Sequence, residues 1–259
     1  MGLKHSTKTG GVDPSDFKLF SYLLMFIKEP VNITINGEST HREPVTQFKI
    51  KPSFWLEDHC NCCGRCCKNL GMAYFETEMK EIKNSSNPNK DIILSRVEPT
   101  IVNLNGKEKI FYNEKPIPDS QCIRNTTEGR NFVACPYVDK KSETLFLCKI
   151  HDIRSFTCKF PHIKFTFSKD RQNISMHTAQ YGRNHQLKCY AQFTEPTLLG
   201  VKNKLDILKD FYNKTQYLEV STWLPEIIQF IENNMETFAK KGFPTQDVIF
   251  TLNQKRKLF

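Results

Sequence analysis

Five of the ten cysteines in this 259-residue chain fall within eight consecutive positions, 60 to 67. Four of the five form the pattern C-x2-C-x2-C-C, and the fifth, Cys62, lies inside it. A spacing of two residues lets a loop fold back so that two thiolates reach one metal centre, with backbone N–H groups directed at the sulfurs. The run therefore predicts a metal site, and the rest of the chain must fold around it.

Eight cysteines are the candidate metal ligands. Four come from the run and four lie further along the chain: Cys60, Cys63, Cys66, Cys67, Cys135, Cys148, Cys158 and Cys189. A tetrahedral zinc site or a cubane iron–sulfur cluster takes about four thiolates, so eight thiolates suit two metal centres. The vicinal pair in the run agrees with two centres, because neighbouring side chains diverge. Cys62 and Cys122 are interpreted as spare thiols.

The pattern favours iron–sulfur over zinc. C-x2-C-x2-C is the front half of the bacterial ferredoxin run, in which the fourth cysteine precedes a proline. Cys135 precedes Pro136 here, although it lies far from the run. Structural zinc usually comes from separated C-x2-C pairs. The compact ferredoxin run is incomplete, so we predict one or two iron–sulfur clusters, of the 4Fe–4S type first, and keep zinc as the alternative.

Composition and the N-terminus bear on the compartment. Hydrophobic residues make up 39% of the chain and charged residues 25%, which is enough for a packed core. No apolar stretch approaches the roughly 18 residues of a membrane-spanning helix, and no signal-like segment directly follows the basic start of the chain. We therefore expect a cytoplasmic protein with no membrane partner, in which reduced cysteines bind metal instead of forming disulfides.

The distribution of cysteines divides the chain into three regions. Residues 1–56 are predicted to form an N-terminal helix and strand extension. Residues 57–195 contain all ten cysteines and are predicted to be the metal-binding domain, an irregular cysteine-rich core with short strands. Residues 196–259 are predicted to be a helical segment packed on that core. The predicted fold class is α+β, with the C-terminal helices flanking the metal-binding part.

Hydrophobic periodicity predicts the individual elements. The N-terminal region should hold a helix over 15–27 and a pair of strands, 31–35 and 47–50, separated by polar loop residues. In the middle region we expect a helix over 76–82 and strands over 109–112, 145–150, 163–167 and 173–178. Apolar residues at helical spacing then predict two helices, around 201–211 and over 224–238. Ser221 or Thr222 should begin the second and Gly242 should end it.

The same cysteines carry a resemblance to a known family. After the run come Cys135-Pro136-Tyr137, then Cys148-Lys149-Ile150-His151, then Arg154 four residues ahead of Cys158, and finally Cys189. This arrangement resembles the YkgJ-type cysteine-cluster family, the CxxCxxCC zinc- or iron-chelating domain, over about residues 57–195.

Two residues depart from the family pattern. Ser155 stands where the family has a proline, and Lys159 where it has an arginine. Lysine lacks the planar fork of arginine, so a bidentate contact is not expected at position 159.

The resemblance implies metal binding and leaves the function open among three hypotheses. The first is an iron–sulfur protein with a redox or accessory role and an unidentified redox or protein partner. The second is a zinc-stabilised binding module for a protein or nucleic acid, although the basic residues behind the +9 charge are too dispersed to favour nucleic acid. The third is a metal-dependent protein-modifying transferase, because flagellin lysine methylases carry a similar cluster.

No catalytic residue is predicted. The chain has no G-x-G-x-x-G, P-loop, G-x-S-x-G or HExxH motif. The sequence does not indicate an oligomeric state.

Overall fold

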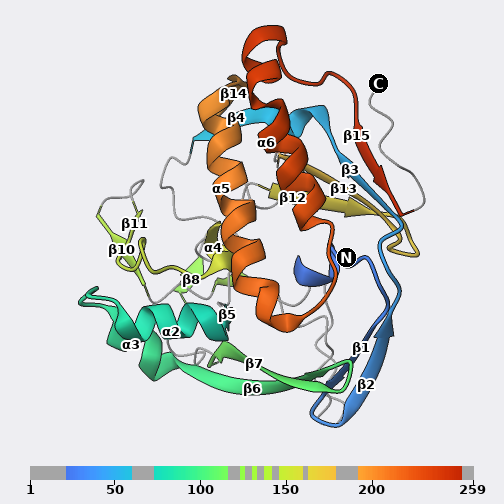
Figure 1. Ribbon diagram of the computed structural model, residues 1–259. Helices are drawn as coiled ribbons and strands as arrows, with labels where there is room; N and C mark the ends of the chain where they lie inside the picture. The colour runs from blue at the N-terminus through green and yellow to red at the C-terminus, as the bar shows by residue number, and fades with distance from the viewer. Residues whose placement is uncertain are drawn as a thin grey trace.

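The computed structural model describes residues 22–59, 73–115, 123–125, 130–132, 137–141, 146–159, 163–178 and 192–252. Strands in several sheets and helices packed against them confirm the predicted α+β class. Figure 1 shows helices α5 (Leu198–Thr215) and α6 (Leu224–Lys241) side by side through the middle of the molecule. Eight of the ten cysteines of the predicted metal-binding domain lie outside the described residues.

The larger sheet has five strands in the order β2-β1-β6-β7-β5, and every neighbouring pair is antiparallel. Its strands are β1 (Val31–Ile35), β2 (Glu38–Arg42), β5 (Ala73–Phe75), β6 (Val97–Leu104) and β7 (Lys107–Glu114). Both of its tight hairpins turn at an Asn-Gly pair, at positions 36–37 and 105–106. All four of these residues have positive φ, the conformation that a type I′ turn requires and that Asn-Gly favours.

The second sheet has four strands in the order β12-β13-β3-β15, with bounds Ile163–Phe167, Asn173–Thr178, Gln47–Ile50 and Val248–Thr251. The β12–β13 hairpin has the bounds that alternation predicted. β3 runs parallel to β13, and β15 pairs antiparallel with β3. β15 is a strand inside the segment predicted to be helical, so that part of the prediction is wrong. Its four residues were too few to reveal the alternating period.

Two further expectations for the N-terminal region are corrected. The polar residues between β1 and β3 were predicted to be a loop, but they contain β2. β1 and β3 do not pair and belong to different sheets. The predicted 15–27 helix is described only from residue 22, and it is helical over 22–24. It ends before Ile27, which forms a bridge with Thr222.

Short elements make up most of the described cysteine-bearing region and its borders. They are η2 (Pro52–Trp55), β4 (Leu56–His59), α2 (Glu76–Asn84), α3 (Lys90–Arg96), β8 (Ile123–Asn125), β9 (Arg130–Phe132), β10 (Val138–Lys140), β11 (Phe146–Cys148), α4 (Phe156–Lys159) and β14 (Gln192–Pro196). Figure 1 shows α2, α3 and the β10–β11 pair on one side of α5. The predicted helix over 76–82 is confirmed as α2.

The two long helices follow from apolar residues at helical spacing. The Thr197 side chain caps α5 by accepting a hydrogen bond from Gly200 N. α6 begins at Leu224 after Trp223, without a side-chain cap, so Ser221 and Thr222 do not serve as predicted. Gly242, with φ of 85°, ends α6 as expected, and the short η5 (Gln216–Leu218) follows α5. Across the described residues, no helix has the length and apolar character needed to cross a bilayer.

The main core lies between the two larger sheets and the long helices, and it is rich in phenylalanine. Phe211 of α5 is fully buried at its centre. Its ring stacks on Phe156 at 4.2 Å and also contacts Phe75 and Phe26 at 5.7 and 5.8 Å between centroids. One side chain of α5 therefore joins elements from the start, the middle and the end of the chain.

A second, smaller cluster packs around α2 and the β10–β11 pair, and we call it the cysteine-side cluster. Its fully buried members are Tyr74, Met79, Ile82, Ile93, Tyr137 and Ile150. Cys148 and Cys158 pack against it, half-buried.

Candidate metal centre

The two predicted ligands that the structure describes pack against the same hydrophobic cluster. Cys148 is the last residue of β11, and Cys158 lies in α4. They come from different elements, yet both pack on the cysteine-side cluster, and they do not form a disulfide with each other. The other predicted ligands lie outside the described residues, as do the spare thiols: Cys60, Cys63, Cys66, Cys67, Cys135, Cys189, Cys62 and Cys122.

The surroundings of Cys148 suit a thiolate ligand. Burial raises the pKa of its thiol, while the backbone N–H of Ile150, which donates to the sulfur, and the charge of Arg154 act in the opposite direction. An N–H group directed at sulfur two residues earlier is the local arrangement that stabilises a metal-bound thiolate. A metal would favour the deprotonated form further, because a coordinating thiol loses its proton. The donor chemistry at this position therefore fits a metal.

Cys158 is held through its own short helix. Its backbone N–H donates to Ser155 O at 2.8 Å, and the first residue of α4, Phe156, stacks on Phe211 of the main core. Ser155 is fully buried and its hydroxyl donates to Ala73 O. Helix α4 is thus fixed on one side to the main core and on the other to β5.

The two departures from the family pattern both have partners in the structure. The Ser155 hydroxyl makes the bond to β5 that a proline could not make. Lys159 forms an ion pair with Asp210 of α5 at 2.8 Å. Asp210 in turn pairs with Lys214 at 3.2 Å. Burial would raise the pKa of Asp210, but the bonds and charges of these two lysines outweigh it and lower the pKa. Lys159 therefore binds Asp210 through its ammonium, without the bidentate contact that an arginine could make.

The described residues that flank the cysteine segments in the sequence fall into two groups. β5 begins directly after residues 60–72, and its first residue accepts the Ser155 bond. Tyr137 follows Cys135-Pro136, and its carbonyl accepts from Lys149 N at 2.8 Å. Val138 faces Cys148 across the β10–β11 pair. The second group lies at the β4–β14 pair, where His59 and Gln192 are partners. These are the last described residue before Cys60 and the first after Cys189.

Glu78 is a buried carboxylate beside the cysteine-side cluster that sequence reasoning did not single out. It is 3% exposed and accepts backbone N–H groups from Phe75 at 2.9 Å and Phe156 at 2.8 Å. Lys214 Nζ lies 4.0 Å from Glu78 Oε1. Burial raises the pKa of Glu78 to about 7 against the opposing effect of these partners. The buried Glu78 carboxylate therefore joins β5 to the start of α4.

Two tyrosines are buried in the cysteine-side cluster. Tyr74 and Tyr137 are both fully buried. Burial first, then the neighbouring Tyr137 and Cys158, raises the pKa of Tyr74 far above its ordinary value. The Tyr74 hydroxyl therefore stays protonated and neutral near the Cys158 thiol.

Several polar residues lie close to the cysteines in the sequence. His151 is exposed, and the charge of Arg154 lowers its pKa. Asp152 accepts a hydrogen bond from Asn87 Nδ2 at 2.6 Å. Glu57 accepts from the Thr197 hydroxyl at the start of α5. His59 ends β4, and His162 lies outside the described residues. Within the described ranges, no three His, Cys, Asp or Glu side chains form a group that could hold a metal by themselves.

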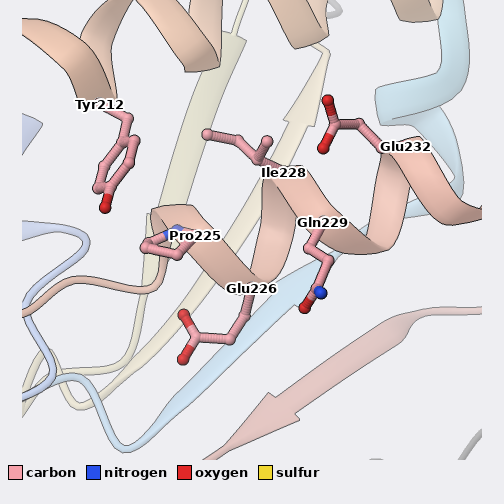
Figure 2. Close-up of a pocket in the computed structure, with 6 residues that line it drawn as sticks. All are labelled: Tyr212, Pro225, Glu226, Ile228, Gln229 and Glu232. Atoms are coloured by element: carbon pink, nitrogen blue, oxygen red, sulfur yellow. The ribbon is translucent and has the colours of Figure 1, made fainter.

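A pocket is formed by residues of the two long helices. It has a volume of about 450 Å³ and is lined by Tyr212 of α5 and by five residues of α6: Pro225, Glu226, Ile228, Gln229 and Glu232 (Figure 2). No cysteine or histidine lines it. Glu226 pairs with Lys28, and Glu232 pairs with Lys209 at 2.5 Å. This hollow offers no thiolate chemistry.

Comparison with known proteins gives one family match, over the cysteine-bearing part. Residues 59–181 match the CxxCxxCC family model, whose description is "Putative zinc- or iron-chelating domain". Over these residues, a little under half of the chain, the protein is similar to that domain. The match spans the run, Cys135, Cys148 and Cys158, and it supports a metal-binding role. Cys189 lies beyond the matched residues. No curated protein and no solved structure matches the chain.

Sequence reasoning missed the side chains that hold the domain in place. Glu78, Lys214 and Lys204 are charged residues on amphipathic helices, where the usual expectation is a solvated face. Each is buried. Their one available signal was position: each lies on the stripe of apolar residues that its helix turns to the core, such as Val201, Leu205 and Leu208 around Lys204.

Proposed function

We propose that this chain is an iron–sulfur protein, with cysteine-ligated centres of the 4Fe–4S type and a redox or accessory role. The observation that carries the proposal is that the half-buried Cys148 and Cys158 pack against one buried cluster, within the stretch that matches a zinc- or iron-chelating family. The ferredoxin-like run adds the preference for iron–sulfur. The eight cysteines named above remain the predicted ligand set.

The chain's own residues would hold and shield such a centre. Cys148 and Cys158 would each supply one thiolate, and the N–H of Ile150 would stabilise the first. A bound cluster would supply one-electron redox chemistry. The apolar members of the cysteine-side cluster would exclude water from one side of it, which influences the reduction potential. A reducing, cytoplasmic setting and a redox or protein partner belong to the same proposal.

The test is to purify the protein without oxygen and measure iron, acid-labile sulfide and zinc per chain together with the visible spectrum. The proposal expects a brown protein with broad absorbance near about 400 nm and matched iron and sulfide, as cubane clusters give. A colourless protein with bound zinc would overturn the iron–sulfur assignment and keep the metal-binding domain. A protein without either metal would overturn both.

A further inference from the structure

Two buried charged side chains outside the cysteine set lie at the two ends of the first cysteine segment, residues 60–72. The chain runs into this segment through η2 and β4 and leaves it into β5. Lys204 of α5 lies at the first end and Glu78 of α2 at the second, and each is 3% exposed. One is a hydrogen-bond donor and the other an acceptor, so they bind opposite groups of the backbone.

Lys204 binds the chain ahead of the segment. Its ammonium donates to Phe54 O at 2.8 Å and to Leu56 O, which lies four residues before Cys60. It also donates to the Thr178 hydroxyl at 3.2 Å, which itself donates to Phe54 O at 3.3 Å. Thr178 is the last residue of β13, directly ahead of the residues that contain Cys189. One ammonium therefore joins α5 to the approaches of two cysteine segments.

Glu78 binds the chain behind the segment. One carboxylate oxygen accepts from Phe75 N in β5 and the other from Phe156 N at the start of α4. The Ser155–Ala73 bond joins the same two elements. The exit of the first cysteine segment and the helix that contains Cys158 are thus held by the same carboxylate.

Ionised groups suit this task because charge-assisted hydrogen bonds are roughly twice as strong as neutral ones. A carboxylate has two oxygens, and an ammonium has three donors, so each can hold several backbone groups at once. Neutral replacements of similar shape would fill the same volume but lose part of this set.

We propose that Glu78 and Lys204 are positioning residues for the metal centre. Lys204 fixes the backbone that leads into the first cysteine segment, and Glu78 fixes β5, which follows that segment, together with the start of α4, which contains the predicted ligand Cys158. The inference rests on the proposed metal-binding function. It predicts that the chain prepares the geometry of the site before the metal arrives. Outer groups that orient metal ligands typically contribute 10- to 100-fold in affinity, and we expect an effect of about that size.

The experiment titrates metal-free, reduced protein with Co²⁺ without oxygen and follows the thiolate-to-cobalt absorption. Glu78→Gln is compared with Glu81→Gln on the same helix, whose side chain is 63% exposed and also contacts Lys214. Lys204→Met is compared with Lys202→Met, exposed on α5. We expect Glu78→Gln and Lys204→Met to bind Co²⁺ about 10- to 100-fold more weakly and with an altered spectrum. The two controls should match the wild type.

Affinity is measured on the folded fraction, with unfolding of the metal-free proteins recorded separately. A purely structural role would lower the unfolding temperature and leave affinity and spectrum unchanged, which would overturn the inference. Glu78→Asp keeps the charge but reaches less far, so it should lose part of the affinity, and it replaces Glu78→Gln if that variant does not fold. Wild-type protein that binds no Co²⁺ would overturn the metal-binding function as well, which separates the two failures.

Discussion

The main core and the cysteine-side cluster differ in the number and type of their buried side chains. The main core combines both larger sheets with α5 and α6, and its largest buried side chains are aromatic. Each such side chain contributes about 1.5–3 kcal/mol by burial, so the region has ample apolar stabilisation of its own. The cysteine-side cluster has six fully buried members, two of them tyrosines, and two thiols at its edge. We expect metal binding to supply stability that the smaller apolar cluster does not provide there.

The two regions meet at α4. Phe156 stacks on Phe211 in the main core, while Cys158, two residues later, packs on the cysteine-side cluster. The Glu78 carboxylate accepts a hydrogen bond from the backbone N–H of Phe156. The cysteine side is therefore anchored to the main core through α4, and we expect changes on the two sides to have separable effects.

The largest expected effect comes from removing both described thiols. Cys148→Ser/Cys158→Ser should abolish binding at the affected centre and remove metal-binding free energy on the order of 10 kcal/mol. The matched control is Cys62→Ser/Cys122→Ser, which replaces the two predicted spare thiols and should retain the wild-type metal content. Metal analysis per chain checks both. Equal metal loss in the two double variants would contradict the ligand assignment.

A smaller effect is expected at the centre of the main core. Phe211→Ala should lower the free energy of unfolding by about 3–5 kcal/mol, because it leaves a cavity among three aromatic rings. Phe167→Ala is the control, since that ring is 51% exposed and the change should stay within about 0.5 kcal/mol. Denaturant unfolding of metal-free protein measures both. Similar losses in the two variants would mean that Phe211 is not central.

The smallest effect concerns pH and the carboxylate between the regions. Burial raises the pKa of Glu78 from 4.5 to about 7, so the folded protein binds this proton more tightly than the unfolded chain. Stability should therefore rise as pH falls from about 7 to 4.5 and be lost as pH rises through about 7. At about 1.4 kcal/mol per pKa unit, the change is at most roughly 3 kcal/mol.

Glu78→Gln should flatten this part of the stability profile, whereas the exposed Glu81→Gln should keep it. Urea unfolding of the metal-free proteins between pH 5 and pH 8 provides the comparison. A wild-type profile already flat over this range would show that Glu78 does not titrate there.

Local patterns predicted the parts of the fold that depend on local sequence. The alternation in 163–167 and 173–178 predicted β12 and β13, and helical spacing predicted α5 and α6. Pairing between distant strands was not predictable in this way, as the separation of β1 from β3 shows. The Asn-Gly pairs at 36–37 and 105–106 were a readable hairpin signal, and attention to the first would have identified β2.

The candidate site likewise contains residues that the sequence could predict and residues that it could not. Spacing and residue type predict the eight cysteines as ligands, because thiolate ligands have a recognisable spacing in the sequence. Glu78 and Lys204 were not recognisable, since their roles arise from tertiary contacts with Phe156 in α4 and Thr178 in β13. A buried charge on a helix looks like a solvated one until the fold places backbone groups around it.

The most direct test of the account is amide hydrogen exchange on metal-loaded and chelator-treated protein at the same pH. We predict that metal removal lowers protection in β10, β11 and α4 while α5 and α6 keep theirs, because the main core does not depend on metal. Equal loss of protection in both regions, or no change in β10, β11 and α4, would contradict the claim that metal stabilises the cysteine side alone.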